Sequence, residues 1–353
     1  MMVIVFRVDS SIQIGSGHLM RCLTLAGQLQ KKSNANIIFI CRNLEGNLSN
    51  LVKTHGYKLI LLPAVDIFVS KLDGYAKWLT VSQDYDAYET MQQLKDLSPV
   101  DYIVVDSYAI DKKWEIQIRP YVNKIMVIDD LANRKHDCDI LLDQNFYLDN
   151  DIRYIGMVPQ KCKMLLGPRY ALLRDEFHQV KNKMRIRDGS IKNILIFFGG
   201  SDLTNETMKA LKAIALLRNK DITVNVITGE NNSHNNEIEK YCTQYDNIHY
   251  YCQVDNMAEF MNEADIAIGA GGTTTWERCF LGLPAIVIAV AENQVKICED
   301  CAKEGFIIYL GYYIEVNYVD IYQYLGCLNK ASLSKINKRC LSEKMGNIAM
   351  NNV

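Results

Sequence analysis

The turn Gly15-Ser16-Gly17-His18 has the clearest potential for chemistry in this sequence. It follows an apolar run, Val3–Val8, and precedes an amphipathic stretch, His18–Lys32, which predicts a strand, a glycine-rich turn and a helix that opens with a histidine. Glycines let a ligand approach the backbone closely, and a helix N-terminus attracts anions. An imidazole beside such an anion site exchanges a proton near neutral pH. The turn indicates chemistry on a phosphate-bearing substrate, with a structural role for His18 as the alternative.

Familiar phosphate-binding motifs do not fit this turn. No Gly-Lys-Ser/Thr follows, which excludes a Walker A loop, and Met20 stands where a dinucleotide fingerprint needs its third glycine. His136 and His178 are weaker candidates for catalysis. Asp9 is close to His18 in sequence, and we expect it to orient the imidazole.

Two further turns in the second half of the chain also suggest anion binding. In Gly199-Gly200-Ser201-Asp202, backbone N–H groups and the Ser201 hydroxyl are suited to a diphosphate, although a plain tight turn has the same composition. In Gly269–Glu277, the glycines and hydroxyls around Gly272 and Thr273 predict an anion nest at a helix start. Glu277, one turn into that helix, is placed to accept hydrogen bonds from a ribose diol or merely to complement the helix dipole.

Strand-like and helix-like segments alternate twice along the chain. This alternation predicts parallel sheets with crossover helices, organised as an α/β protein of two Rossmann-like domains that face each other across a cleft. A charged stretch without strands, 167–191, separates the two series and gives expected domains at 1–180 and 191–353. The expected strands are Val3–Val8, Asn36–Cys41, Tyr57–Leu62, Tyr102–Asp106, Lys124–Asp129, Asn193–Phe198, Thr223–Thr228, Asn247–Tyr251, Ile266–Gly269 and Ala285–Val290.

The composition limits the classes of function. The 353 residues are 49% hydrophobic and 23% charged, which is typical of globular domains. The 39 basic and 41 acidic residues nearly balance, so the chain has no net positive charge that would attract nucleic acid or an anionic membrane. No apolar run approaches the length of a membrane span, and Met1–Val8 is too short for a signal peptide, so we expect none. We expect a cytoplasmic protein, a monomer or weak oligomer. The lone Cys298-Glu-Asp-Cys301 lacks the further ligands of a zinc site, so we expect neither metal nor cofactor.

Several longer motifs resemble a known family. The second-half turns look like the GT-B architecture of nucleotide-sugar enzymes and the donor site of the lipid II N-acetylglucosaminyltransferase. The first-half motifs are more specific and resemble the UDP-sugar hydrolases of pseudaminic acid biosynthesis, over residues 3 to about 310. These motifs span residues 7–11, 14–26, 106–108, 128–130, 137–145 and 167–177.

The resemblance implies hydrolysis of UDP-2,4-diacetamido-2,4,6-trideoxy-β-L-altropyranose to UDP and the free sugar, without metal and with inversion at the anomeric carbon. It implies that His18 is the catalytic base. The expected sugar-side residues are Arg7, Asp9, Gly15, Gly17, Arg21, Tyr108, Tyr170, Arg174 and Gln294, and the expected UDP-side residues are Gly200, Ser201, Gly272, Thr273 and Glu277.

The residues agree with such a reaction. Glycosidases need a carboxylic acid to protonate a poor leaving group, whereas UDP leaves as a phosphate whose second pKa is about 6. One general base that activates water, such as neutral His18, is then sufficient. A GT-B glycosyltransferase with a UDP-sugar donor, a non-catalytic UDP-sugar-binding protein and a UDP-sugar 2-epimerase are the alternatives, and UDP release without an acceptor separates the first two from a hydrolase.

Overall fold

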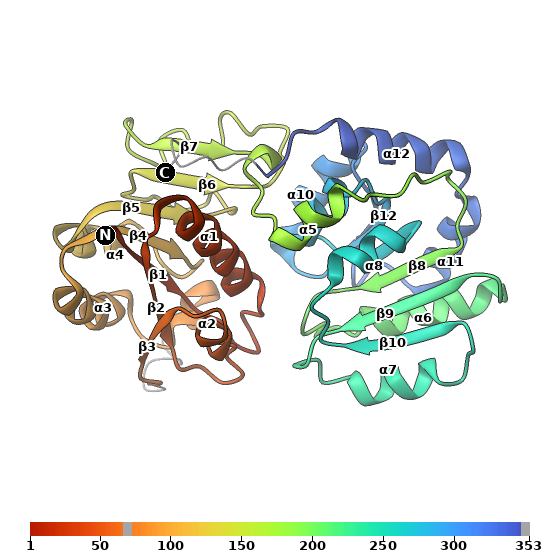
Figure 1. Cartoon of the computed structure of the whole chain (residues 1–353), viewed down its shortest axis with the longest axis horizontal. Coiled ribbons are helices and arrows are strands. Elements are labelled where there is room, and N and C mark those ends of the chain that lie inside the picture. Colours follow the sequence, from red (N-terminus) through yellow and green to blue (C-terminus); the bar gives the residue numbers. More distant parts are fainter. Residues whose placement is uncertain (66–72, 347–353) are drawn as a thin grey trace. The chain divides into compact units, whose positions relative to one another are not determined.

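The computed structural model describes residues 1–65 and 73–346 and divides them into two compact units (Figure 1). The N-terminal unit comprises 1–145 and 149–172, and the C-terminal unit comprises 146–148 and 173–346. Each unit is an α/β domain built on one parallel sheet, in agreement with the predicted GT-B-like class of two Rossmann-like domains.

The N-terminal unit contains a seven-stranded parallel sheet in the order β3-β2-β1-β4-β5-β6-β7. Strand β1 pairs with β2 on one side and β4 on the other, so that Phe6 lies opposite both Phe39 and Val104. Helices α1 and α2 cover one face of the sheet, and α3 and α4 cover the other. The strands are β1 Val3–Val8, β2 Asn36–Arg42, β3 Lys58–Leu62, β4 Val100–Asp106, β5 Val122–Ile128, β6 Ile140–Asp143 and β7 Lys163–Leu166.

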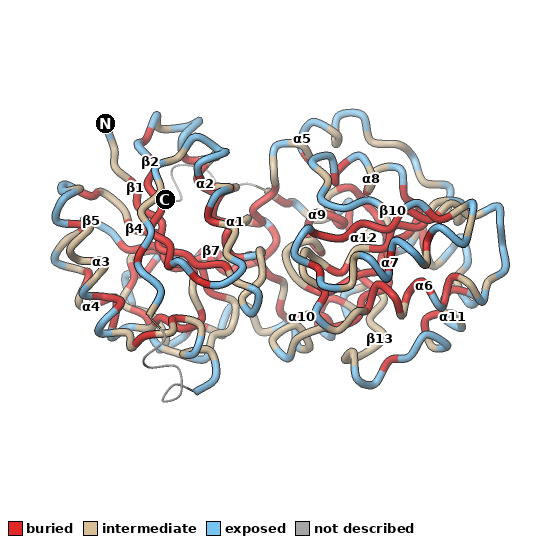
Figure 2. Tube along the Cα trace, turned by 90° about the horizontal axis from the view of Figure 1, so that it is seen from below, coloured by how far each residue is buried: buried red, intermediate tan, exposed pale blue. Residues whose placement is uncertain are grey.

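The C-terminal unit contains a six-stranded parallel sheet in the order β10-β9-β8-β11-β12-β13. Its central strands consist largely of buried Ile, Val, Leu and Ala, the composition expected when helices cover both faces of a parallel sheet (Figure 2). The strands are β8 Asn193–Phe197, β9 Thr223–Thr228, β10 Ile248–Cys252, β11 Ile266–Ala270, β12 Ala285–Ala289 and β13 Ile308–Tyr312.

The helices follow the apolar periodicity of their sequences. Helix α1 buries Leu19, Cys22, Leu23 and Ala26, the stripe expected of an amphipathic helix. The α-helices are α1 Gly17–Ser33, α2 Asn50–Thr54, α3 Gln83–Leu97, α4 Lys112–Ile118, α5 Asp175–Lys181, α6 Glu206–Leu217, α7 Asn235–Cys242, α8 Met257–Glu263, α9 Thr274–Phe280, α10 Glu292–Lys303, α11 Tyr318–Cys327 and α12 Lys330–Ser342. The 3₁₀ helices are η2 Gly74–Leu79, η3 Arg119–Tyr121 and η4 Pro168–Tyr170.

The boundary between the units lies earlier than the sequence suggests. The division falls after Leu172, so α5 belongs to the C-terminal unit and not to a domain 1–180. The charged stretch that follows α5 is not a free linker, because its arginines bind the C-terminal unit. Arg185 pairs with Asp265, and Arg187 donates to the carbonyl oxygens of Met261, Ala264 and Leu281.

The last two helices pack on the C-terminal unit, which the sequence pattern left open. Helix α12 lies against α9, and α11 lies against α6. Within the described residues, no helix is both long enough and apolar enough to cross a bilayer.

Candidate functional site

The predicted functional turns lie at the points where the strand order of each sheet reverses. In the N-terminal unit, β1 stands between β2 and β4, and the turn that contains Gly15 and His18 follows β1. In the C-terminal unit, β8 stands between β9 and β11, and the turns that contain Gly200 and Gly272 follow β8 and β11. Open α/β sheets bind their ligands at these switch points, beyond the carboxyl ends of the strands.

His18 is held by Asp106, the last residue of β4. The Nδ1 atom of His18 lies 2.7 Å from Oδ1 of Asp106, and both side chains are buried. An ionised carboxylate only accepts hydrogen bonds, so in the neutral imidazole Nδ1 carries the proton and Nε2 the lone pair. The expectation that Asp9 orients His18 is therefore wrong, because Asp106 takes that position from a different strand.

Arg21 keeps Asp106 ionised. Burial by itself raises the pKa of Asp106, but the Arg21 guanidinium and His18 more than offset this effect and lower that pKa well below its usual range. Arg21 reaches both oxygens of Asp106 at 2.6 Å through Nε and Nη2, and its Nη1 lies 2.9 Å from Asp130. Arg21, predicted as a substrate-binding residue, thus lies in the site with its guanidinium engaged by two carboxylates.

An aromatic wall, defined here as Tyr75, Trp78 and Tyr108, stands beside His18. The Tyr108 ring lies edge-on to the imidazole with centroids 4.6 Å apart, which brings together two predicted site residues. The Trp78 ring is also edge-on to His18 at 5.7 Å, and it stacks on Tyr108 at 5.3 Å. Tyr75 meets both Trp78 and Tyr108 at 4.8 and 5.1 Å. Tyr75 and Trp78, both on η2, lie in a segment without a recognisable motif, so nothing in the sequence singled them out.

The glycines of the first turn border open space. A Cβ atom added to Gly15 or Gly17 meets no atom within 4 Å, and Gly15 has φ of +77°, a conformation that favours glycine. The turn is closed by a hydrogen bond of 2.8 Å from Gly15 N to Ser11 O. Both glycines therefore border space that a ligand could occupy, and their role in substrate binding stays a prediction.

Arg7 and Asp9, expected on the sugar side, are buried in an ionic cluster. Arg7 is fully buried, and its guanidinium pairs with Asp86 through Nε and Nη2 and with Asp9 through Nη1. Oδ1 of Asp9 also accepts from the backbone N of Arg42, whose side chain binds Asp86 as well. This ionic cluster lies under the site and joins β1, β2 and α3.

Two other residues predicted from the sequence, Tyr170 and His136, are held by packing or by a carboxylate. Tyr170, predicted as a sugar-side residue, lies on η4 and packs against the core beneath α1. His136 is buried, and its Nδ1 lies 2.6 Å from Glu115.

A buried carboxyl, Asp143, lies at the end of β6 in the same unit. Burial and the charge of Asp130 raise the pKa of Asp143 well above its usual range. Its Oδ1 accepts from Asn145 N at 3.0 Å, and its Oδ2 lies 3.0 Å from the Tyr154 hydroxyl. The carboxyl groups at the ends of β4 and β6, which are separated by β5 in the sheet, thus have opposite pKa shifts: that of Asp106 is lowered and that of Asp143 is raised.

In the C-terminal unit, the turn after β8 is shaped by close backbone contact. Gly199 has φ of +94°, and a Cβ added to Gly229 would lie 2.3 Å from the carbonyl oxygen of Gly200. Asp202 caps α6 by accepting from the backbone N–H groups of Glu206 and Thr207 at 3.0 and 2.9 Å. The N-terminus of α6 is therefore already occupied by a carboxylate, which leaves Gly200 and Ser201, ahead of the cap, as the part of this turn available to a ligand.

The turn after β11 is stabilised by a buried arginine of the same unit. Arg278, which is buried, donates to Ala270 O at 2.9 Å and to the Thr275 hydroxyl at 3.1 Å. A Cβ on Gly271 would lie 2.3 Å from Cys298 Sγ, so Gly271 is required for packing, whereas Gly272 has open surroundings and φ of +138°. Gln294, a predicted site residue, lies against this turn and accepts from Val290 N at 3.0 Å.

Arg174 and Glu277, predicted for the sugar and the ribose, bind each other. Nε of Arg174 lies 2.8 Å from Oε1 of Glu277, and Nη1 of Arg174 lies 2.7 Å from Glu176. Glu277 is buried on α9, and Arg174 belongs to the C-terminal unit, not to the sugar-side domain in which the sequence placed it. The guanidinium holds the Glu277 carboxylate in a fixed position beside the Thr273 turn.

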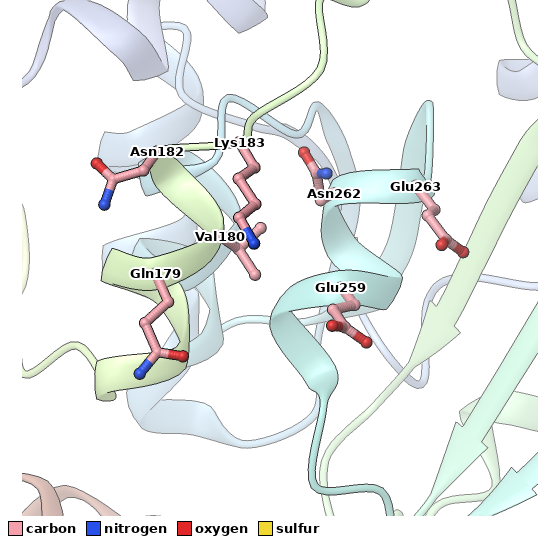
Figure 3. Close-up of a pocket in the computed structure, with 7 residues that line it drawn as sticks. All are labelled: Gln179, Val180, Asn182, Lys183, Glu259, Asn262 and Glu263. Atoms are coloured by element: carbon pink, nitrogen blue, oxygen red, sulfur yellow. The ribbon is translucent and has the colours of Figure 1, made fainter.

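A separate groove of about 530 Å³ lies between α5 and α8 (Figure 3). Its lining contains none of the predicted site residues. The lining residues are Gln179, Val180, Asn182, Lys183, Glu259, Asn262 and Glu263.

Comparison with known proteins agrees with this arrangement. Residues 194–305 match the glycosyltransferase family 28 C-terminal domain. The chain is 29% identical over 335 residues to an uncharacterized protein of Methanocaldococcus jannaschii, a match that covers 91% of this chain but only 63% of that longer protein. It is 28% identical over 307 residues to the UDP-2,4-diacetamido-2,4,6-trideoxy-β-L-altropyranose hydrolase of Campylobacter jejuni, covering 86% of this chain and 98% of that protein.

Among solved structures, the MurG protein of Acinetobacter baumannii matches 98% of this chain and 96% of its own, with a TM-score of 0.63 at 14% identity. At this identity the likeness concerns the fold alone. The resemblance predicted from the sequence is thus confirmed: this GT-B-like chain is a relative of the UDP-2,4-diacetamido-2,4,6-trideoxy-β-L-altropyranose hydrolase, and its second half matches the glycosyltransferase family 28 C-terminal domain.

Proposed function

We propose that this chain hydrolyses UDP-2,4-diacetamido-2,4,6-trideoxy-β-L-altropyranose to UDP and the free sugar, with His18 as the general base. The observation that carries the proposal is the buried His18–Asp106 pair, with Nδ1 2.7 Å from the carboxylate and the open Gly15–Gly17 turn beside it. The relative in Campylobacter jejuni, which is named as a hydrolase of this substrate, supports the choice of reaction.

The geometry suits water activation. Asp106 fixes the proton of His18 on Nδ1, so Nε2 is free to take a proton from a water molecule. The water oxygen forms a bond to the anomeric carbon, the bond from that carbon to the diphosphate oxygen breaks, and UDP leaves with the electron pair. Attack from the face opposite the leaving group inverts the configuration. The transferred proton remains on His18 until solvent removes it, while Asp106 stabilises the imidazolium.

The leaving group needs no protein acid. A departing diphosphate is stable as an anion, because the pKa of its last proton is about 6. Backbone N–H groups at Gly200 and Gly272 and the hydroxyls of Ser201 and Thr273 are the proposed partners of the diphosphate. Glu277, held by Arg174, is the proposed acceptor for the ribose hydroxyls.

The test is UDP release from the purified UDP-sugar without any acceptor, measured for wild type, H18N and H18F. We expect wild-type turnover and a loss of about 10²- to 10⁴-fold in kcat for both variants, the range of general base catalysis. Near-wild-type turnover in the variants excludes His18 as the base. Release of UDP only after an acceptor is added indicates a glycosyltransferase instead, and saturable binding without release indicates a binding protein.

Two additional measurements test the finer features of the proposal. Turnover in excess EDTA should equal turnover without it if the reaction needs no metal. The anomeric proton signals of the first product formed should show the inverted configuration.

A further inference from the structure

Tyr75 and Trp78, on η2, are the more exposed residues of the aromatic wall beside His18. Tyr108 is buried, whereas Tyr75 and Trp78 are half-buried. Trp78 combines an edge contact to His18 with a stacked contact to Tyr108, so its position relative to the imidazole is fixed on two sides. A sugar bound beside His18 on the side of these rings would lie against this wall.

Within this wall, the ring face of Trp78 is poor at holding polar groups. An indole ring offers a single N–H donor, and a hydroxyl laid on an aromatic face loses its water without gaining a partner. A methyl group on the same surface is stabilised by its removal from water. Of the ring substituents in the proposed substrate, the C6 methyl is the one that carries no polar atom, whereas both acetamido groups need hydrogen-bond partners.

We propose that Trp78, supported by Tyr75, is a specificity-determining residue that selects a methyl over a hydroxymethyl group at C6 of the sugar. This inference rests on the proposed function, because it takes His18 as the base that acts at the anomeric carbon. It assigns to the N-terminal unit the discrimination between 6-deoxy sugars and their 6-hydroxy counterparts.

The first experiment compares two UDP-2,4-diacetamido sugars that differ only at C6, methyl against hydroxymethyl. A hydrophobic pocket rejects an added hydroxyl by on the order of 10²-fold, so we expect wild-type kcat/KM to favour the methyl sugar by about 10- to 100-fold. Trp78→Gln should lower this preference by about tenfold or more, whereas Trp78→Phe, which keeps an aromatic face, should retain most of it. Tyr88→Gln, an exposed aromatic on α3, is the matched control and should leave the preference unchanged.

Melting temperatures show whether each variant is folded, because Trp78 also packs against the core of the unit. A wild-type preference near one, or a folded Trp78→Gln variant with an unchanged preference, overturns the inference.

The second experiment does not depend on turnover. The chain has three tryptophans, and Trp114 and Trp276 are fully buried, so ligand-dependent fluorescence should come mainly from Trp78. In the H18N background, we expect tighter binding of the methyl sugar and a fluorescence change that disappears in H18N/W78F. UDP alone measures any effect on Trp276, which precedes Glu277 in sequence.

The two experiments separate the two proposals. If wild type releases UDP from neither sugar, the hydrolase proposal fails, and the binding data still decide the role of Trp78. Equal affinities for the two sugars, or a fluorescence change that persists without Trp78, overturn the inference whether or not the chain is a hydrolase.

Discussion

His18 and Asp106 form a buried pair that joins the first turn of α1 to the end of β4, with Nδ1 2.7 Å from Oδ1. The two residues are 88 positions apart in sequence and meet because β1 and β4 are neighbours in the sheet. Arg21, one turn after His18 on the same helix, binds the same carboxylate. The pair therefore has a fixed proton position and a permanently charged partner, which are the features that a general base of the proposed kind requires.

Asp106→Asn tests this pair. The amide can donate to Nδ1, which favours the tautomer with its proton on Nε2 and removes the lone pair that accepts the proton from water. We expect kcat to fall about 10²- to 10⁴-fold with a much smaller change in KM. Steady-state UDP release gives both constants, and circular dichroism checks the fold, because Arg21 loses its charged partner. Asp130→Asn, which changes the outer partner of Arg21 and a contact to Asn145, should reduce kcat less, and an equal loss in both variants contradicts a special role for Asp106.

Gly17→Ala should change the stability of helix α1 and the KM for the substrate in different ways. Gly17 is the first residue of α1, its φ is not positive, and an added Cβ meets no atom, so alanine should stabilise the helix by about 0.5–1 kcal/mol. If substrate occupies that space, the methyl group should raise KM several-fold. Thermal unfolding and kinetics on the same preparation measure both effects.

Gly27→Ala is the matched control for this substitution. Gly27 lies in the middle of α1, and its added Cβ would make an ordinary contact of 3.6 Å with the Tyr57 hydroxyl. This variant should also be more stable and should keep the wild-type KM. Unchanged kinetics in Gly17→Ala would mean that the open space beside this glycine is not part of the substrate site.

Most of the α/β framework could be predicted from the sequence, because buried parallel strands are apolar runs and their helices repeat every 3.6 residues. Strands β1 and β9 agree with the predicted bounds. Strand β7 has only four residues, and β13 is half-buried and rich in tyrosine, so neither gives a clear apolar pattern. The boundary was misplaced because charge at 174–187 suggested a linker, whereas those arginines bind the C-terminal unit.

The site was predictable only where it depends on local sequence. Glycine turns and the histidine that opens a helix are local features, so the Gly15–His18 turn could be recognised. The partner of His18 depends on which strands are neighbours, whereas proximity in sequence points to Asp9 and not to Asp106. Arg7 was misjudged for the same reason, since only the fold shows that Asp86 buries its guanidinium.

Glu277→Gln tests the proposed ribose contact. The amide keeps the volume of the side chain but accepts only through one oxygen and no longer pairs electrostatically with Arg174. We expect UDP to bind about tenfold more weakly by calorimetry, with a smaller effect on kcat at saturation.

Glu176→Gln is the control for this variant, because Glu176 also pairs with Arg174 but lies on α5. If both variants weaken UDP binding equally, the effect comes from the position of Arg174 and not from a contact between Glu277 and the ribose.

Asp143→Asn tests the neutral state of the buried carboxyl. Burial and Asp130 raise the pKa of Asp143 in the folded protein, so the native state holds this proton more tightly than the unfolded chain. The stability of the wild type must therefore fall as pH rises from the unfolded pKa of about 4 toward the higher native pKa, by up to about 1.4 kcal/mol per pH unit. Asparagine resembles the protonated acid and does not titrate, so the variant should lack this part of the pH dependence.

We expect the melting temperature of Asp143→Asn, relative to wild type, to increase between pH 5 and pH 8. The amide can accept from Asn145 N and donate to the Tyr154 hydroxyl, which in turn donates to Asp129 O, so the hydrogen bonds around the site are preserved. A variant that loses stability relative to wild type as pH rises would show that Asp143 is ionised in the native protein. In that case its charge, like that of Asp106, would be held by neighbouring cations, with Arg153 as the nearest candidate at 3.9 Å.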